Sequence, residues 1–145
     1  MCPRPLVSVR KHERVNSPIK AVGLVRYVDQ RLLLVRSQDQ EAFYLPGGTI
    51  EPGETEQHAL HREVAEELGV VLREPEFLAR YRTDAVGRGD GVQVDLACYT
   101  GAVDGEPVAS AEIAELGWFT RAEYAEHRVT APAIVELFAD LDSGL

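Results

Sequence analysis

Residues 48–70 constrain the fold of this chain more than any other segment, because they carry the start, the buried face and the end of one helix in order. The Pro52-Gly53 pair predicts a turn, and Thr55 is a suitable N-cap for the helix that follows. Gly69 is a natural residue for the position just after a helix ends. An apolar stripe with a spacing of four residues lies between these limits: Leu60, Val64 and Leu68. We therefore predict a helix that ends at Leu68 and buries one face.

Segments with the composition of strands lie on both sides of this helix. The run 32–35 (Leu-Leu-Leu-Val) predicts a buried strand, and Asp29-Gln30 before it suits a tight hairpin although it lacks the usual glycine. The alternation of apolar and polar residues over 92–99 is typical of a half-buried strand. The predicted strands are 19–28, 31–36, 77–83, 92–99 and 116–119, and further helices are predicted over 121–127 and 132–141. This order favours an α+β domain in which helices pack on a mixed sheet.

Composition agrees with one globular domain and excludes several other classes of protein. A chain of 145 residues with 45% hydrophobic and 27% charged residues is large enough to bury a proper core. No stretch approaches the ~20 apolar residues of a membrane helix, and residues 1–15 lack the apolar region of a secretory signal. Two cysteines are too few for a disulfide framework. We expect a cytoplasmic protein that does not enter a membrane, with a single domain over 18–145 and a tail or an added strand over 1–17.

Negative charge is concentrated in the helix-forming segment. The chain has a formal charge of −9, and residues 48–70 alone hold six acidic residues against one arginine, a net of −5. A charge of this sign argues against a broad nucleic-acid surface, because such surfaces neutralise phosphates with Lys and Arg. It does not argue against a small phosphorylated substrate, provided that cations bind among the acidic residues.

Three of these acidic residues share one face of the predicted helix. Glu63, Glu66 and Glu67 are three and four residues apart, which places their carboxylates within an arc of about 100° beside the apolar stripe. Like charges at this spacing repel by roughly 0.2–0.5 kcal/mol per pair, so a positive group is expected nearby. An oxygen-rich site of this kind suits Mg²⁺ or Mn²⁺ rather than zinc. The alternative is that the three glutamates form a solvated acidic face.

The spacing of the whole segment favours the metal-binding interpretation. Its fixed positions are Gly48, five residues, Glu54, seven residues, Arg62-Glu63-Val64, one residue, Glu66-Glu67, one residue, and Gly69-Val70. This pattern resembles the signature of the Nudix hydrolase family at every defined position. The resemblance implies an α/β/α sandwich with a mixed β-sheet, in which the motif forms a loop-helix-loop. It also implies an enzyme that uses Mg²⁺, or Mn²⁺, to cleave a pyrophosphate bond in a nucleoside diphosphate linked to another moiety, by attack of water at phosphorus.

The same resemblance assigns roles to individual residues of the motif. Arg62 joins the glutamates in the catalytic set as an organiser of their carboxylates, and Glu54 and Gly48 would support the set from the surrounding loops. One of the helical glutamates would also act as the general base. The implied metal ligands are the carbonyl of Gly47 and the side chains of Glu63, Glu66 and Glu67.

Residues outside the motif are candidates for the remaining tasks. Some family members place an additional ligand or base on a later loop, and Glu112 and Glu115 are the candidates here. The expected partner is a small phosphorylated substrate, a nucleotide derivative, and the frequency of dimers in the family suggests a homodimer. Weaker candidates for substrate binding, taken from the predicted strands and the loop before the motif, are Arg26, Arg36, Tyr44 and Arg82.

The identity of the substrate is not specified by the sequence. The secondary motifs of the groups that act on dinucleoside polyphosphates, ADP-ribose, NADH and coenzyme A are absent from the positions where the family has them. A nucleoside di- or triphosphate derivative is therefore the default expectation. The alternative function is a Nudix-fold sensor that binds a nucleotide without turnover, which the intact glutamates disfavour.

Overall fold

Two β-sheets form the centre of the molecule. The computed structural model describes residues 17–145, so the tail or strand predicted over 1–17 lies outside the described residues except for Ser17. One sheet is mixed, with the strand order β4-β1-β6-β5, and the other is antiparallel, with the order β2-β3-β7. The strands are β1 (Ile19–Val25), β2 (Tyr27–Val28), β3 (Arg31–Ser37), β4 (Gly47–Thr49), β5 (Val71–Asp84), β6 (Gln93–Asp104) and β7 (Ile113–Phe119).

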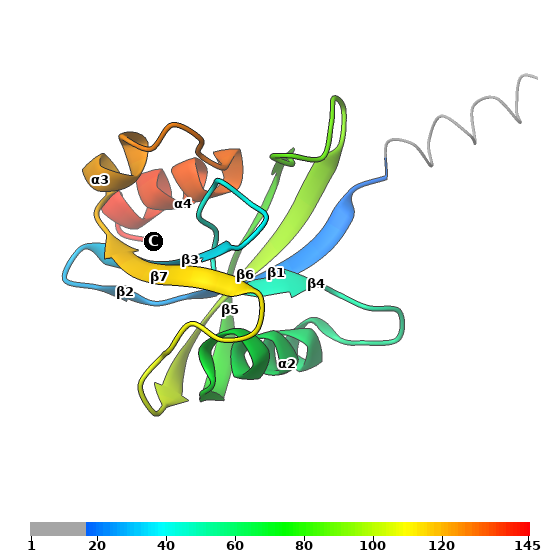
Figure 1. Ribbon diagram of the computed structural model, residues 1–145, viewed down its shortest axis with the longest axis vertical. Coiled ribbons are helices and arrows are strands. Elements are labelled where there is room, and N and C mark those ends of the chain that lie inside the picture. Colours follow the sequence, from blue (N-terminus) through cyan, green and yellow to red (C-terminus); the bar gives the residue numbers. More distant parts are fainter. Residues whose placement is uncertain (1–16) are drawn as a thin grey trace, which may run out of the picture.

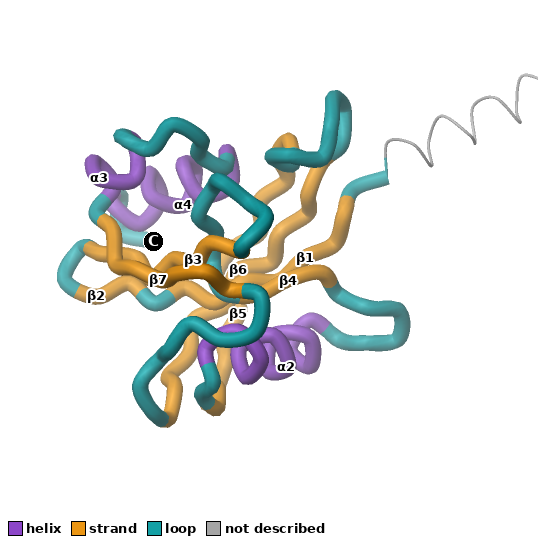
Figure 2. The backbone as a smooth tube through the Cα atoms, in the orientation of Figure 1, coloured by secondary structure: helices purple, strands orange, loops and turns teal. Residues whose placement is uncertain are grey.

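Helices cover the strands on two sides. Helix α2 (Glu56–Leu68) lies on one side, and α3 (Arg121–Ala125) and α4 (Pro132–Asp142) lie on the other, with both sheets between them (Figure 1). Figure 2 shows the same layers, with α2 below the orange strands and α3 and α4 above them. Each interface has its own core of buried residues, one built on the apolar stripe of α2 and one on α4. The predicted α+β class and the α/β/α sandwich are confirmed, with the sheet layer divided into two sheets. In residues 17–145 no helix is both long enough and apolar enough to cross a membrane.

The limits of α2 follow the local signals in the sequence. The Thr55 side chain accepts a hydrogen bond from the His58 N–H at 3.0 Å, as an N-cap should. Gly69 adopts a left-handed φ of 67° and its N–H donates to the Ala65 carbonyl, which ends the helix. The tight turn at Asp29-Gln30 is also confirmed, because both residues have positive φ, 54° and 64°. The motif therefore folds as a loop, a helix and a loop.

Strand β5 is longer than predicted and is interrupted near its start. It begins at Val71 rather than at Phe77, and its register with β6 shifts twice, between Arg73 and Glu76 and again between Phe77 and Ala79. The first shift accompanies a residue of positive φ, 49°, directly before a proline: Glu74 and Pro75. These irregularities hid the first half of the strand from pattern reasoning, because a bulge breaks the two-residue period.

Strand β6 occupies the middle of the mixed sheet, between β1 and β5. Ala97, Cys98 and Tyr99 are buried in succession, so the predicted alternation between a buried and an exposed face is wrong for this part of the strand. The reason is that helices cover both faces of the sheet here, and a strand buried on both faces loses the alternating pattern.

Candidate functional site

A cavity of about 500 Å³ opens beside the motif, between α2, the two sheets and the start of α4. Its lining combines carboxylates from the motif with apolar and aromatic side chains from the strands. The residues from α2 and β4 are Glu63, Glu67, Gly47, Gly48 and Thr49. The opposite parts of the lining come from the loops and from the start of α4, and include Tyr44, Val86, Arg88, Glu112, Ala131 and Ile134.

Glu67 is the most deeply buried of the motif glutamates, with 7% of its surface exposed. Its position among the stripe residues of α2 turns the carboxylate toward β4, where Oε1 accepts a hydrogen bond from the Gly47 N–H at 3.0 Å. Burial, opposed by the Gly47 hydrogen bond and reinforced by the nearby charges of Glu63, Glu112 and Glu66, raises the pKa of Glu67 to about 8. A nearby cation would stabilise the ionised form of a carboxyl group held in this way.

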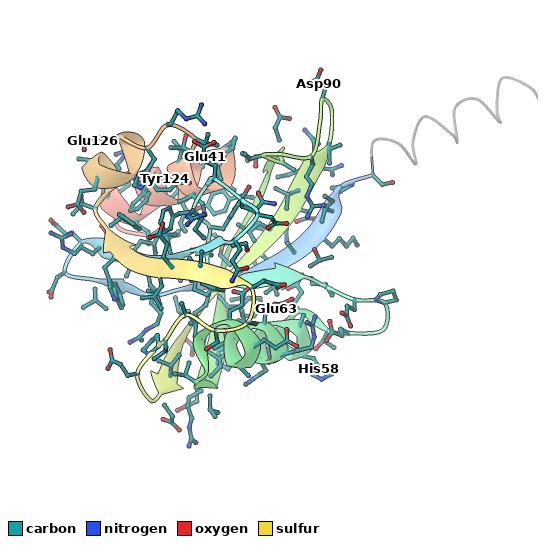
Figure 3. The ribbon with its side chains drawn as sticks, in the orientation of Figure 1. Glu41, His58, Glu63, Asp90, Tyr124 and Glu126 are labelled. Carbon is teal, nitrogen blue, oxygen red and sulfur yellow. The ribbon has the colours of Figure 1, made fainter. Side chains whose placement is uncertain are left out.

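Glu63 packs against the backbone of Gly48. A Cβ atom at Gly48 would lie 2.4 Å from Oε2 of Glu63, so only glycine leaves room for the carboxylate in this position. The Arg62 Nη1 group donates to the same oxygen at 3.1 Å. Burial raises the pKa of Glu63, and the Arg62 charge partly offsets that rise. Figure 3 shows Glu63 between α2 and the strands, whereas His58 lies on the outer side of the helix.

Arg62 connects the helix to the loop that precedes it. Its Nε and Nη2 groups donate to the two carboxylate oxygens of Glu54, both at 2.8 Å, in a bidentate pair. Glu54 also accepts the N–H of Glu51 at 3.0 Å, which closes the turn. The Arg62 guanidinium lowers the pKa of Glu54 to about 2. Arg62 thus holds the loop with one side of its fork and Glu63 with another donor.

The remaining candidates for metal binding differ in position. Glu112 lines the cavity, and its charge raises the pKa of both Glu63 and Glu67. Glu66 lies outside the cavity lining with 53% of its side chain exposed, 3.8 Å from Arg62. Glu115 is also outside the lining, and it forms an ion pair with Arg36 at 2.9 Å across the β3–β7 register.

Of the four weaker candidates for substrate binding, the structure brings only Tyr44 to the cavity. Arg26 donates to the Gly101 carbonyl, and Arg36 is occupied by Glu115 and by nearby carbonyls. Arg82 is exposed and does not contribute to the lining. Strand position alone could not separate these cases, because it does not say which face of a strand meets the cavity.

Sequence reasoning missed two contributors to the cavity. Arg88 lies in the glycine-rich loop between β5 and β6, outside the predicted strands, and was not among the candidates. The start of α4, with Ala131 and Ile134, also lines the cavity, although it is far from the motif in sequence. The three glycines around Arg88 were the available signal, because they mark a loop that can fold back over a site.

The donor set of the cavity fits a hard divalent cation. Carboxylates of Glu63, Glu67 and Glu112 face one space, and oxygen ligands are those that Mg²⁺ and Mn²⁺ prefer. Burial raises the pKa of both Glu63 and Glu67, and only Glu63 has a positive partner, Arg62, that offsets part of the rise. Within residues 17–145, no three His, Cys, Asp or Glu side chains are already gathered at metal-binding distance. Binding would therefore require side-chain movement in addition to deprotonation.

Comparisons with known proteins agree with the geometry. The family model described as the NUDIX domain matches residues 17–141. A "MutT-like protein" from Streptomyces ambofaciens is 31% identical over 125 residues, which are 84% of this chain and 78% of that protein. An "ADP-ribose pyrophosphatase" from Methanocaldococcus jannaschii is 30% identical over 90 residues, 59% of this chain and 53% of that protein. The solved structure of a "NUDIX hydrolase from Nitrosomonas europaea" has a TM-score of 0.69 at 26% identity and covers 88% of this chain and 90% of its own.

Proposed function

The chain belongs to the Nudix family of pyrophosphohydrolases, and from this premise we propose that its cavity binds a divalent cation and a nucleoside di- or triphosphate derivative. The observation that carries the proposal is the grouping of Glu63, Glu67 and Glu112 on the wall of one cavity next to the glycines of β4. An acidic wall repels a diphosphate unless cations lie between them, so this arrangement favours metal-assisted hydrolysis over direct binding of the anion.

The residues that would hold Mg²⁺ or Mn²⁺ are Glu63 and Glu67, together with Glu66 and the Gly47 carbonyl. The bound cation would neutralise phosphoryl oxygens and lower the pKa of a coordinated water. Glu66 would have to turn inward from its exposed position to take part. Glu112, on the loop before β7, is the candidate for a further ligand or for the base that accepts a proton from water.

The other residues of the motif orient these carboxylates. The Gly47 N–H fixes one oxygen of Glu67, and Arg62 fixes one oxygen of Glu63 while Glu54 holds Arg62 in place. Such positioning contributes to rate because displacements of about 1 Å at a reacting centre cost on the order of 100-fold. Arg62 is therefore a positioning residue in this proposal.

The decisive experiment is a panel of nucleoside triphosphates, nucleoside diphosphates, nucleotide sugars and ADP-ribose, assayed with Mg²⁺ and with Mn²⁺ for release of phosphate, pyrophosphate or nucleotide. We expect turnover of at least one class and none in EDTA. Binding of a nucleotide without release of any product would support the sensor alternative instead. The expected homodimer and the expected cytoplasmic location stay predictions.

A further inference from the structure

The charged residues that line the cavity are distributed unevenly. Five of them are acidic, and among residues 17–145 a single basic side chain contributes to the lining, Arg88. The acidic residues are Glu51, Glu63, Glu67, Asp84 and Glu112. Because the acidic wall is suited to cations and phosphate, the basic side chain is available for another part of the substrate.

The loop that carries Arg88 is held against the cavity. Its two ends are joined by the Ala85 N–H, which donates to the Val92 carbonyl at 2.8 Å. The Tyr44 hydroxyl donates to the Val86 carbonyl at 3.4 Å, which ties the loop to the segment before β4. Gly87 and Gly89 have φ values of 77° and 92°, so the backbone on both sides of Arg88 adopts conformations that glycine permits at low cost.

The hydrogen-bond donors of the Arg88 guanidinium are not used within the described part of the chain. No hydrogen bond or ion pair joins it to another described residue of the chain, whereas each of seven other arginines pairs with a carboxylate: Arg31, Arg36, Arg62, Arg73, Arg80, Arg121 and Arg128. Its positive charge acts on Tyr44, where it offsets part of the rise in pKa that burial causes. Arg88 is exposed and shares the cavity lining with Tyr44, so its guanidinium remains open to a ligand.

The surroundings of Arg88 are suited to a flat ring. Tyr44 is half-buried, and it shares the cavity lining with Val86, Ala131 and Ile134. Apolar and aromatic side chains pack well on the faces of a ring, while the planar guanidinium presents parallel donors to two adjacent acceptors on its edge. Adjacent acceptors distinguish the purines, because guanine offers O6 and N7 whereas adenine offers N7 beside an N6 donor.

We propose that Arg88 is the specificity-determining residue of this cavity and that it binds the O6 and N7 edge of a guanine-type base packed near Tyr44. The inference rests on the proposed function, which places the phosphates at the carboxylate wall. It adds which base is selected at the other end of the cavity, near Arg88. A guanine nucleotide, which carries an oxo group at C6, is accordingly preferred to an adenine nucleotide with the same number of phosphates.

The test compares GTP with ATP, which differ only in the base. We expect Arg88→Ala to lower kcat/KM for GTP by roughly 10- to 100-fold, mainly through KM, and to change kcat/KM for ATP by less than about 3-fold. Arg88→Lys keeps the charge but not the fork, so it should lose most of the preference for GTP. Arg121→Ala is the matched control, because Arg121 is an exposed arginine paired with Asp142 outside the cavity, and it should leave both substrates unchanged.

A binding experiment separates this inference from the proposed function. GMP and AMP contain no pyrophosphate bond, so their affinities can be measured by calorimetry in Mg²⁺ without turnover. Tighter binding of GMP that Arg88→Ala abolishes would support the assignment even if no substrate were hydrolysed. Equal losses of GTP and ATP hydrolysis in Arg88→Ala would place Arg88 on the phosphates and overturn the assignment. Unchanged kcat/KM values for both GTP and ATP in Arg88→Ala would overturn it as well.

Discussion

Glu54 and Glu67 belong to the same motif and carry the same functional group, yet their environments shift them in opposite directions. The pKa of Glu54 falls to about 2 because Arg62 donates two hydrogen bonds to its carboxylate. The pKa of Glu67 rises to about 8 because it is buried and faces other carboxylates. The difference shows that one acidic residue is satisfied within the chain, whereas the other lacks a positive partner.

This contrast divides the motif into a scaffold and a reactive part. Glu54 and Arg62 fix the loop before α2 and need no ligand to do so. Glu67 is held by a single backbone N–H and has further acceptor capacity directed at the cavity. Stability should therefore depend more on the Glu54–Arg62 pair than on Glu67, and activity should depend most on Glu67.

The most demanding test of this division is Glu67→Gln. We expect turnover to fall by roughly 100-fold or more, because the amide cannot bind a cation or accept a proton as the carboxylate does. The metal-free variant should be at least as stable as the wild type at pH 8, since a buried charge has been removed. Steady-state kinetics and thermal unfolding in EDTA measure the two effects. Glu136→Gln, on the exposed side of α4, is the control and should alter neither.

Addition of metal should sharpen the same contrast. Saturating Mg²⁺ is expected to raise the melting temperature of the wild type by several degrees, because a ligand at 100 times its Kd stabilises the folded state by about 2.7 kcal/mol. The increase should be largely lost in Glu67→Gln and retained in Glu136→Gln. Differential scanning calorimetry with and without EDTA provides the measurement. An identical increase in wild type and Glu67→Gln would remove Glu67 from the metal site.

Gly48→Ala tests whether the backbone beside Glu63 is part of the reactive region. The added Cβ would meet Oε2 of Glu63 at 2.4 Å and force the carboxylate to move, so we expect turnover to fall roughly 10- to 100-fold. Gly53→Ala is the comparison, because its Cβ would meet no atom within 4 Å while its φ of 86° remains strained. That variant should lose about 1 kcal/mol of stability and keep its turnover. Equal activity of Gly48→Ala and wild type would contradict the packing described.

The smallest expected effect concerns the pH dependence of the scaffold. A lowered folded-state pKa means that Glu54 stabilises the fold above the usual glutamate pKa of about 4.3, and that this contribution is lost as the pH falls toward 2. Glu54→Gln should unfold at a lower temperature than the wild type at pH 7, and the gap should close between pH 4.5 and 2. Thermal unfolding followed by circular dichroism across this range checks the trend. A gap that did not change with pH would assign the effect to packing rather than to charge.

The sequence was most informative where a local signal sets the structure. Thr55, Gly69 and the turn at Asp29-Gln30 act through backbone geometry within a few residues, so their prediction needed no knowledge of the fold. The spacing of the motif glutamates likewise follows from the period of a helix. What the helix faces is a tertiary matter, and Glu67 was predicted at the edge of the apolar stripe but lies within it, 7% exposed.

The rest of the site depends on contacts between distant segments. Arg36 and Glu115 were separate candidates, and they pair with each other because β3 and β7 are neighbours in one sheet. Arg88 and the start of α4 reach the cavity through the packing of the β5–β6 loop and the helices. Periodicity cannot predict such contacts, because they are fixed by the order of strands in the sheet and not by residues that are close in sequence.

Strand β5 forms the outer border of the mixed sheet, and within residues 17–145 it pairs with β6 alone. A border of this length would invite another chain to add a strand, yet it is bent by two bulges and contains a proline that has no N–H to offer. The irregular start of β5 is therefore poorly suited to edge-to-edge pairing with a strand of another molecule. Replacing Pro75 and removing the bulges should make this edge more available for pairing between molecules.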